Sequence, residues 1–226
     1  MSSNADFKIA VCIRTRDREH LFPWVKGIVE AQTIGMDRMH IIIVDGAEED
    51  RQVWSAWDAG NLHYIHAPNI ILGASNNLAI RLAQDLESEY IALWDDDDWY
   101  APEYLENAVA VIEQRNVNVV GESLISVYFR NLKEIWQMGP YGAYHALEPT
   151  LVFRNSWSIG RYFDENDRLG RGAPFLNNFT ETIGRYPTGL YIHIAHDKNT
   201  FDKKQIIDNP QLFRANKLRN EEIVCW

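Results

Sequence analysis

Apolar runs alternate with segments of helical periodicity along the first half of the chain. The runs are short, as buried strands are, and the segments between them place apolar residues on one face of a helix. Strands and helices in alternation indicate βαβ units and a mainly parallel sheet covered on both faces. The expected strands lie at residues 7–13, 40–44, 61–67 and 90–94, and the expected helices at residues 21–32, around residues 76–82 and at residues 103–114.

The second half of the chain has a different pattern. Residues 117–138 predict two strands joined by a turn at residues 130–133, and these strands are less uniformly apolar than the first ones. We therefore expect antiparallel pairing here. The pattern further predicts a short strand at residues 150–153, a helical turn at 156–160, a helix at 174–184, a last strand at 190–195 and an irregular polar tail at 201–226.

Composition and charge narrow the class of protein. The chain has 226 residues, of which 46% are hydrophobic, and this suits one compact α/β domain. A net charge of −10 gives no electrostatic footprint for nucleic acid or an anionic membrane. Cys12 and Cys225 give no disulfide framework and no zinc spacing. Without an export signal or an apolar run long enough to span a bilayer, the sequence predicts a cytoplasmic protein with no transmembrane segment.

Four consecutive aspartates, Asp95–Asp98, directly follow the apolar strand at residues 90–94. Clustered carboxylates repel one another, so a folded domain retains them chiefly where a cation neutralises them. Oxygen ligands suit Mg²⁺ or Mn²⁺, which keep open positions for substrate phosphates. The group predicts a metal-bound diphosphate at this strand end. The alternative is a solvated acidic turn that caps the helix begun by Pro102, although a cap needs only one aspartate.

Polar residues also follow the first two expected strands. Thr15, Arg16 and Arg18 come after the first strand, and Asp45 ends the second. Ligands of open parallel sheets bind beyond the carboxyl ends of the strands, so these residues are candidates to contact a nucleotide. Alternatively, Asp17 caps the next helix and the arginines are solvated. The chain has no GxGxxG or Walker motif, which disfavours a dinucleotide dehydrogenase or a P-loop enzyme.

Several local patterns follow one another along the chain. They are VCIRTRDR, IIIVDG, the long segment GASNNLAIRLAQDLESEYIALWDDDDWYAPEYLE, LVFRNSWSIGRYFDE and HDKNT. In this order they resemble the inverting glycosyltransferases of family 2, which have the GT-A fold. The long segment is the most specific match, because it contains the asparagine-bearing helix and the DxDD-aromatic-x-proline signature of that family. The resemblance implies transfer of a sugar from a nucleoside diphosphate donor to a hydroxyl acceptor.

The resemblance also implies roles for individual residues. The chain is expected to form a single GT-A domain, with a nucleotide-binding half at about residues 6–115 and an acceptor-side half at about residues 116–200. A UDP-sugar is the expected donor, with Mn²⁺ or Mg²⁺ as cofactor. The expected metal ligands are Asp97, Asp95 and His196, and the expected nucleotide contacts are Thr15, Arg16, Arg18, Asp45, Asn77, Asp95 and Asp96.

Two departures from the family pattern affect these expectations. Asn76 stands where many members carry an arginine, so Arg16, Arg18 or Arg81 is expected to supply that contact. The window where the family carries its catalytic base, residues 170–179, contains no carboxylate. The available substitutes for the base are Glu181 on the following helix and the acids of the preceding loop, Asp164, Glu165 and Asp167.

Other functions stay open from the sequence alone. A sugar-phosphate nucleotidyltransferase also places carboxylates and a metal at strand ends, although it would need glycines in the phosphate loop after the first strand. The missing base also allows a module that binds nucleotide sugars without turning them over. The acceptor is a glycan, a lipid-linked glycan, a protein or a modified DNA base, and for the last of these Arg168, Arg171 and the tail could bind phosphates.

Overall fold

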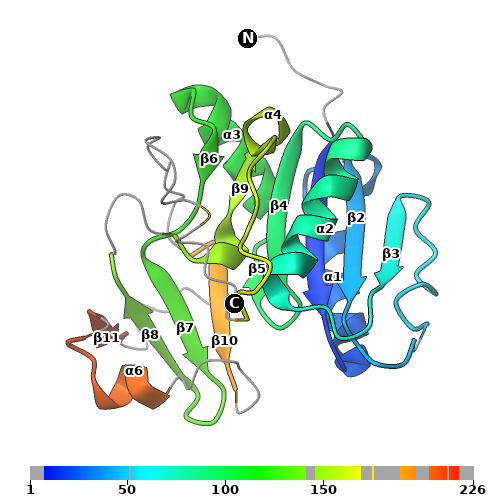
Figure 1. Ribbon diagram of the computed structural model, residues 1–226. Helices are drawn as coiled ribbons and strands as arrows, with labels where there is room; N and C mark the ends of the chain where they lie inside the picture. Colours follow the sequence, from blue (N-terminus) through cyan, green and yellow to red (C-terminus); the bar gives the residue numbers. More distant parts are fainter. Residues whose placement is uncertain are drawn as a thin grey trace.

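Two sheets with helices on both faces of the larger one form the protein (Figure 1). The computed structural model describes residues 8–50, 52–140, 146–168, 175, 189–196, 204–212 and 214–218. The expected α/β fold, with a mainly parallel sheet and a smaller antiparallel portion, is confirmed. Glu181, Arg171 and all of the helix expected at residues 174–184 except Phe175 lie outside the described residues.

The larger sheet has six strands in the order β3-β2-β1-β4-β9-β6. The first four are parallel, whereas β9 runs antiparallel to both of its neighbours, so β6 runs parallel to β4. The carboxyl ends of β1, β2, β4 and β6 therefore meet at one edge. The strands are β1 (Ile9–Thr15), β2 (Met39–Asp45), β3 (Leu62–His66), β4 (Tyr90–Asp95), β6 (Val119–Val120) and β9 (Val152–Arg154).

Helices cover both faces of this sheet, which explains the uninterrupted apolar runs. Ile9, Val11 and Ile13 of β1 pack on the face that carries α1 and α3, and the alternate residues Ala10 and Cys12 pack on the face that carries α2 and α4. Figure 1 shows α2 in front of the sheet and α1 behind it. Among the described residues, no helix is both long enough and apolar enough to cross a membrane. The helices are α1 (Phe22–Glu30), α2 (Leu72–Asp85), α3 (Tyr104–Arg115) and α4 (Asn155–Ser158), with 3₁₀ turns η1 (Glu19–Leu21), η2 (Met36–Arg38) and η3 (Glu148–Thr150).

The smaller sheet lies at the lower left of Figure 1 and has the strand order β11-β8-β7-β10-β5. The expected strand pair at residues 117–138 is present only in part. Its turn forms at the expected place, but the chain leaves the larger sheet at Gly121, so the first expected strand is two strands in two sheets. The strands of the smaller sheet are β5 (Trp99–Tyr100), β7 (Ile125–Phe129), β8 (Glu134–Met138), β10 (Tyr191–Ala195) and β11 (Ala215–Lys217).

The tail is more regular than the sequence indicated, and the expectation of an irregular segment at residues 201–226 is wrong for two parts of it. Helix α6 (Lys204–Asp208) buries Ile206 in the core, and β11 pairs with β8 through Ala215 and Met138. Pairing with β8 satisfies backbone groups that would otherwise form an open sheet edge. A segment this short and polar becomes a strand through that partner rather than through its own composition.

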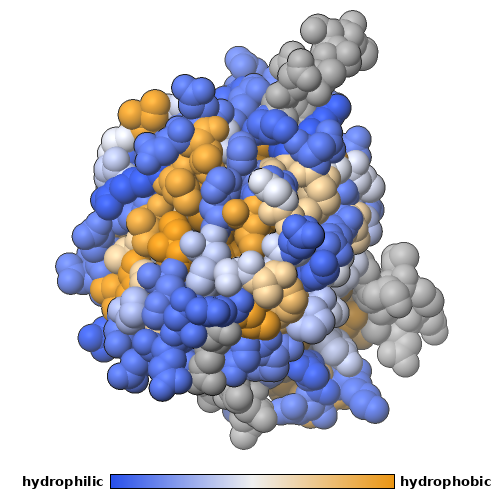
Figure 2. Space-filling view, turned by 90° about the vertical axis from the view of Figure 1, so that its right-hand side faces the viewer, coloured by the Kyte–Doolittle hydropathy of each residue, from blue (hydrophilic) through white to orange (hydrophobic). Residues whose placement is uncertain are grey.

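Strand β3 forms the opposite edge of the larger sheet. All five of its residues are half-buried, as expected for an edge strand with one open side. Figure 2 shows this side of the molecule, where hydrophobic residues gather between hydrophilic ones. The edge carries none of the aspartates, which lie on β4 and the turn after it.

Gly73, in the first turn of α2, lies directly against the loop that contains Asp164 and Asp167. Its backbone N–H donates to the Asp167 carbonyl at 3.0 Å, and a Cβ atom on residue 73 would come within 2.0 Å of the Asp164 carbonyl oxygen. A side chain at this position therefore displaces backbone, which has no rotamer with which to yield.

We predict that Gly73→Ala lowers the free energy of unfolding by roughly 1–3 kcal/mol, as overpacking does. Gly27→Ala is the matched control, because Gly27 is also helical and a methyl group added there would meet nothing within 4 Å. This control should gain about 0.5–1 kcal/mol from helix propensity. Urea denaturation of both variants measures the difference, and equal stabilisation by the two changes would contradict the close approach at Gly73.

Candidate functional site

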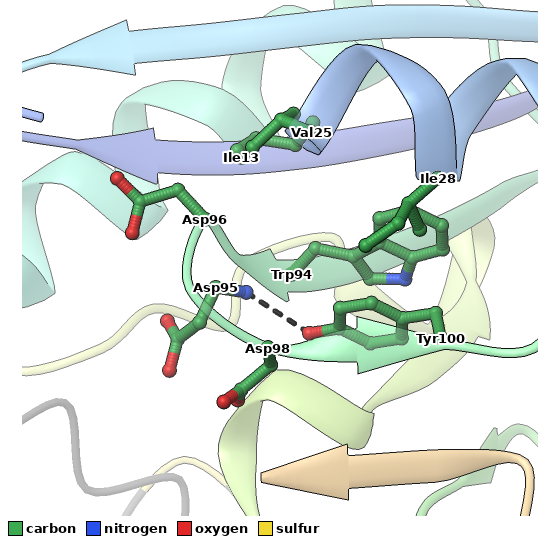
Figure 3. A pocket seen from close by; sticks show the side chains of 8 residues that line it. All are labelled: Ile13, Val25, Ile28, Trp94, Asp95, Asp96, Asp98 and Tyr100. Carbon is green, nitrogen blue, oxygen red and sulfur yellow. Dashed lines mark hydrogen bonds between the residues drawn. The ribbon is translucent and has the colours of Figure 1, made fainter. Parts of the chain in front are cut away.

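The four aspartates form the turn between β4 and β5. Trp94 and Tyr100, on either side of this turn, stack with ring centroids 4.0 Å apart and planes 7° apart. The Tyr100 hydroxyl accepts a hydrogen bond from the Asp95 backbone N–H at 3.0 Å and donates one to the Pro149 carbonyl at 3.0 Å. Figure 3 shows the carboxylates of Asp95 and Asp98 pointing away from the apolar side chains. The aromatic stack thus fixes the turn that presents the carboxylates.

Arg14, at the end of β1, compensates part of this negative charge. It is 6% exposed, and its guanidinium contacts the carboxylates of Asp95 and Glu148. Asn76 donates to the same Glu148 carboxylate at 2.8 Å. Burial raises the pKa of Asp95 well above its ordinary value, and Arg14 opposes that rise. Asn76 therefore belongs to a buried network built around Arg14.

Arg18 supplies a second positive charge. Its guanidinium lies 2.5 Å from Asp96 Oδ1 and 2.9 Å from Asp97 Oδ2. Burial raises the pKa of Asp96 to about 6 although Arg18 opposes it. Burial also favours a higher pKa for Asp97, but the hydrogen bond from His196, at 2.9 Å, and the charge of Arg18 lower its pKa overall. The cation that the aspartates require is thus supplied in part by the protein itself.

Asp98 has a different environment from its three neighbours. It is 1% exposed, and its carboxylate accepts hydrogen bonds from the Tyr191 hydroxyl at 2.5 Å and the Ile194 backbone N–H at 2.9 Å. His193 Nδ1 lies 2.9 Å from the same carboxylate. All three partners lie on β10, so Asp98 connects the turn after β4 to the smaller sheet.

Asp95, Asp97 and Asp98 each offer a carboxylate oxygen within 4.8 Å of the others. An all-oxygen donor set fits Mg²⁺ or Mn²⁺. The oxygens of Asp98 are already used by β10, whereas Asp95 is half-buried and keeps more access to solvent. The arrangement therefore fits a metal held chiefly by Asp95 and Asp97, with His196 beside Asp97.

A small cavity lies beneath the turn, on the side of α1 (Figure 3). Its volume is about 10 Å³, which is room for roughly one water molecule. This cavity is therefore too small to hold a nucleotide. The cavity is lined by Ile13, Val25, Ile28, Trp94, Asp95, Asp96, Asp98 and Tyr100.

The candidates at the ends of β1 and β2 lie at the same edge as the aspartates. Thr15 pairs in register with Asp45, one position after Arg14 pairs with Asp95. Asp45 is 2% exposed and accepts hydrogen bonds from the Ala47 N–H at 2.9 Å and from the Tyr64 hydroxyl at 3.2 Å. The topology thus brings together Thr15, Arg16, Arg18, Asp45 and the aspartate turn.

Asn77 is not available to a nucleotide, so that expectation is corrected. Its side chain is fully buried, and its amide donates to the Phe163 carbonyl at 2.9 Å while accepting from the Phe163 N–H at 2.8 Å. Both ends of the amide are therefore used to hold the loop after α4. A buried amide in a helix and a ligand-binding amide look the same in a sequence.

Two of the loop acids proposed as substitutes for the catalytic base, Asp164 and Glu165, are exposed and used locally, whereas Asp167 is 5% exposed and its carbonyl accepts from the Gly73 N–H. Asp164 Oδ1 accepts from the Asn166 N–H at 2.9 Å, and Glu165 pairs with Arg81 at 3.2 Å. No contact of these two side chains with the aspartate turn is seen within the described residues. Arg81, one of the expected substitutes for the arginine contact, pairs with Glu165 at the surface.

Sequence reasoning missed several residues of this site. Arg14, Glu148, Tyr191 and His193 all contact the aspartate turn or the arginine that compensates it. All but Glu148 left a signal in the sequence. Arg14 is a charge directly after an apolar run, and Tyr191 and His193 are polar-tipped residues spaced two apart on one strand face.

The chain matches one protein family and is similar in structure to several solved proteins. The family model described as Glycosyl transferase family 2 matches residues 23–184. A structure of Staphylococcus aureus TarS residues 1–349 with UDP-GlcNAc is 19% identical with a TM-score of 0.63, and the match covers 85% of this chain and 60% of that one. Another structure of S. aureus TarS is 18% identical with a TM-score of 0.62, and the match covers 84% of this chain and 37% of that one.

A third similar structure is the mannosyltransferase PcManGT from Pyrobaculum calidifontis in complex with GDP-Man and Mn²⁺. It is 14% identical with a TM-score of 0.66, and the match covers 92% of this chain and 62% of that one. The present chain thus spans less than two thirds of the length of each of these structures. No curated protein matches the chain. At these identities the similarity establishes the fold.

We predict that Asp98→Ala lowers the free energy of unfolding by roughly 3 kcal/mol or more, because the buried Tyr191 hydroxyl and His193 ring and the half-buried Ile194 N–H then lose this carboxylate. Asp97→Ala should have a smaller effect of about 1 kcal/mol, because Arg18 and His196 are half-buried and can turn to water. Chemical denaturation of both variants measures this contrast. Equal losses would mean that Asp98 has no special structural role.

Proposed function

The chain belongs to glycosyl transferase family 2, and we propose that it transfers a sugar from a nucleoside diphosphate donor to an acceptor hydroxyl with inversion at the anomeric carbon. The observation that carries this proposal is the common edge at which Asp45, Arg18 and the aspartate turn lie. A UDP-sugar is the proposed donor. UDP-GlcNAc and GDP-Man, which occupy similar structures, are the first donors to test.

The proposed cofactor is Mn²⁺ or Mg²⁺, held by Asp97 and Asp95 with His196 as a further ligand. When bound, such an ion would neutralise charge on the leaving diphosphate. Two features support these ligands: the carboxylate oxygens lie within 4.8 Å of one another, and His196 contacts Asp97. One similar structure is a complex with Mn²⁺.

The chain's own residues would bind and orient the donor. Arg18 keeps 24% of its side chain exposed while pairing with Asp96 and Asp97, so it can turn toward an incoming diphosphate. Asp45 would accept a hydrogen bond from the nucleobase, and Thr15, Arg16, Asp95 and Asp96 complete the proposed nucleotide contacts. The proposed binding is on the open side of the edge, because the cavity below it is too small to hold a nucleotide.

The proposed acceptor side is the smaller sheet together with the loop after α4. The acceptor itself is a glycan, a lipid-linked glycan, a protein or a modified DNA base, and mass spectrometry of products from each class would identify it. We further propose that the described elements work as one domain in the cytoplasm. On this acceptor side the reaction requires a group that takes the proton of the attacking hydroxyl.

We predict that Mn²⁺ and UDP together raise the melting temperature more than the sum of their separate effects, because the ion is shared by the aspartates and the diphosphate. Asp97→Asn should remove this synergy and leave the fold intact. Asp85→Asn, a change to an exposed aspartate at the end of α2, is the control and should behave as wild type. Calorimetry that shows equal UDP affinity with and without metal in the wild type would rule out the metal-bridged mode.

We predict that Asp45→Ala loses selectivity among nucleoside diphosphates while it keeps the metal-dependent part of their affinity. A carboxylate is a strong acceptor for a ring N–H, and alanine offers none. Tyr64→Phe is the control, because it removes one hydrogen bond to Asp45 but keeps the carboxylate. Titrations with UDP, GDP and ADP measure the selectivity, and an unchanged order of affinities in Asp45→Ala would place base recognition elsewhere.

A further inference from the structure

Glu122 is a buried carboxyl group for which the described residues provide no hydrogen bond. It lies between β6 and β7, is 3% exposed, and neither of its oxygens has a partner within the described part of the chain. A buried carboxyl group without a hydrogen-bond partner lowers the stability of the folded protein. A native protein therefore retains such a group chiefly where the group has a function. This burial raises the pKa of Glu122 from its ordinary value of 4.5 to about 8.

The position of Glu122 in the sheet connects it to the aspartates. Its backbone N–H donates to Thr150 Oγ1 at 2.9 Å, just beyond the pairing of Val120 with Val152. Val152 pairs in turn with Ala92 of β4. Because β6 runs parallel to β4 and lies two strands away, the backbone of Glu122 is roughly 10 Å from the carboxyl end of β4.

The side of β4 on which Glu122 lies is as informative as its distance from β4. β1 and β2, which carry the nucleotide candidates, lie on one side of β4, and β6 lies on the other. From β6 the chain passes into β7 of the smaller sheet (Figure 1). Glu122 therefore lies on the side of β4 away from the nucleotide candidates, toward the proposed acceptor side.

No hydrogen bond or ion pair within the described part of the chain explains why the Glu122 side chain is buried. Glu148, on the neighbouring η3, pairs with Arg14 and Asn76 instead. Arg154, on β9, pairs with Glu113. No cation on the described elements packed around Glu122 compensates it, and burial is the one cause of its raised pKa. Within that part of the chain, a buried ion pair is thus excluded as the explanation.

Inverting transfer needs a proton acceptor next to the acceptor hydroxyl. The window at residues 170–179 offers no carboxylate, and Asp164 and Glu165 are exposed and engaged locally. Asp167 is 5% exposed in the loop that packs against Gly73. Building on the function proposed above, we propose that Glu122 is the general base of the transfer reaction. Both Glu122 oxygens are buried and are not used by the described residues, so the proposed role requires that acceptor binding opens a path to them.

In the proposed step, the acceptor oxygen attacks the anomeric carbon and forms the new glycosidic bond, while its proton passes to the Glu122 carboxylate. The bond between the anomeric carbon and the diphosphate oxygen breaks, and its electron pair leaves with the nucleoside diphosphate. A pKa raised toward the working pH strengthens the base that accepts this proton.

The test compares Glu122→Gln with wild type in hydrolysis of UDP-GlcNAc and GDP-Man, with water as the acceptor and Mn²⁺ present. Glutamine keeps the shape of the side chain but cannot take the proton. We expect kcat to fall roughly 100-fold or more, with unchanged affinity for the nucleoside diphosphate. In the wild type the rate should rise with pH through about 8, where Glu122 loses its proton, and the variant should lack this rise.

Matched variants separate this role from its alternatives. Ser123→Ala changes the adjacent buried residue, whose hydroxyl has no partner among the described residues either, and should leave turnover unchanged. Asp164→Asn, Glu165→Gln, Asp167→Asn and Glu181→Gln test the other candidate bases. A large loss of turnover in any of these, with wild-type turnover in Glu122→Gln, overturns the proposal. Loss of donor affinity rather than turnover in Glu122→Gln also overturns it and assigns Glu122 to sugar binding.

A stability measurement gives a readout that does not need turnover. The folded pKa of about 8 lies above the ordinary value of 4.5, so between these values the folded protein binds more protons than the unfolded chain. Stability that depends on Glu122 therefore falls as the pH rises through this range, and Glu122→Gln should reduce that fall. If the wild type hydrolyses neither donor, the proposed function fails as well, whereas hydrolysis that survives Glu122→Gln overturns the role of Glu122 alone.

Discussion

Charge compensation between β1 and β4 is the interaction on which the rest of the site depends. The two strands are parallel neighbours, and their register sets Arg14 opposite Asp95. Arg18, just beyond the end of β1, reaches Asp96 and Asp97. Without these guanidinium groups, four consecutive carboxylates at one strand end would raise each other's pKa and favour protonation or unfolding. Parallel pairing is thus a condition for the site as well as for the fold.

This compensation changes the meaning of the aspartate run. The sequence indicates that a cation must be present, and the structure provides two arginines before any metal is considered. The four carboxylates also have different partners, because Asp98 holds β10 while Asp95 contacts Arg14 and Asp97 contacts Arg18 and His196. A motif of identical residues therefore contains both a structural anchor and the candidate ligands.

The sequence predicted the elements whose signal is local. The apolar runs of β1, β2 and β4 exist because both faces of these strands are covered, and a reader of the sequence sees that directly. The sequence could not show that the segment through Gly121 divides into β6 and β7 of two different sheets, since both strands are apolar. It also could not show that Asn77 is used by Phe163, 86 residues away, because such a contact exists only after folding. The same reason hid the partnership of Arg14 and Glu148, which spans 134 residues.

The anchoring of Asp98 has a consequence for the order in which the protein is made. Its hydrogen-bond partners on β10 follow it by 93 to 96 residues along the chain. At a synthesis rate of roughly 5–20 residues per second, the ribosome adds that stretch in about 5–20 seconds. During this interval β1, β2, β3 and β4 are already available for pairing, while Asp98 has only water as a partner. The nucleotide-side sheet can therefore form on the nascent chain well before the turn that presents the aspartates acquires its final shape.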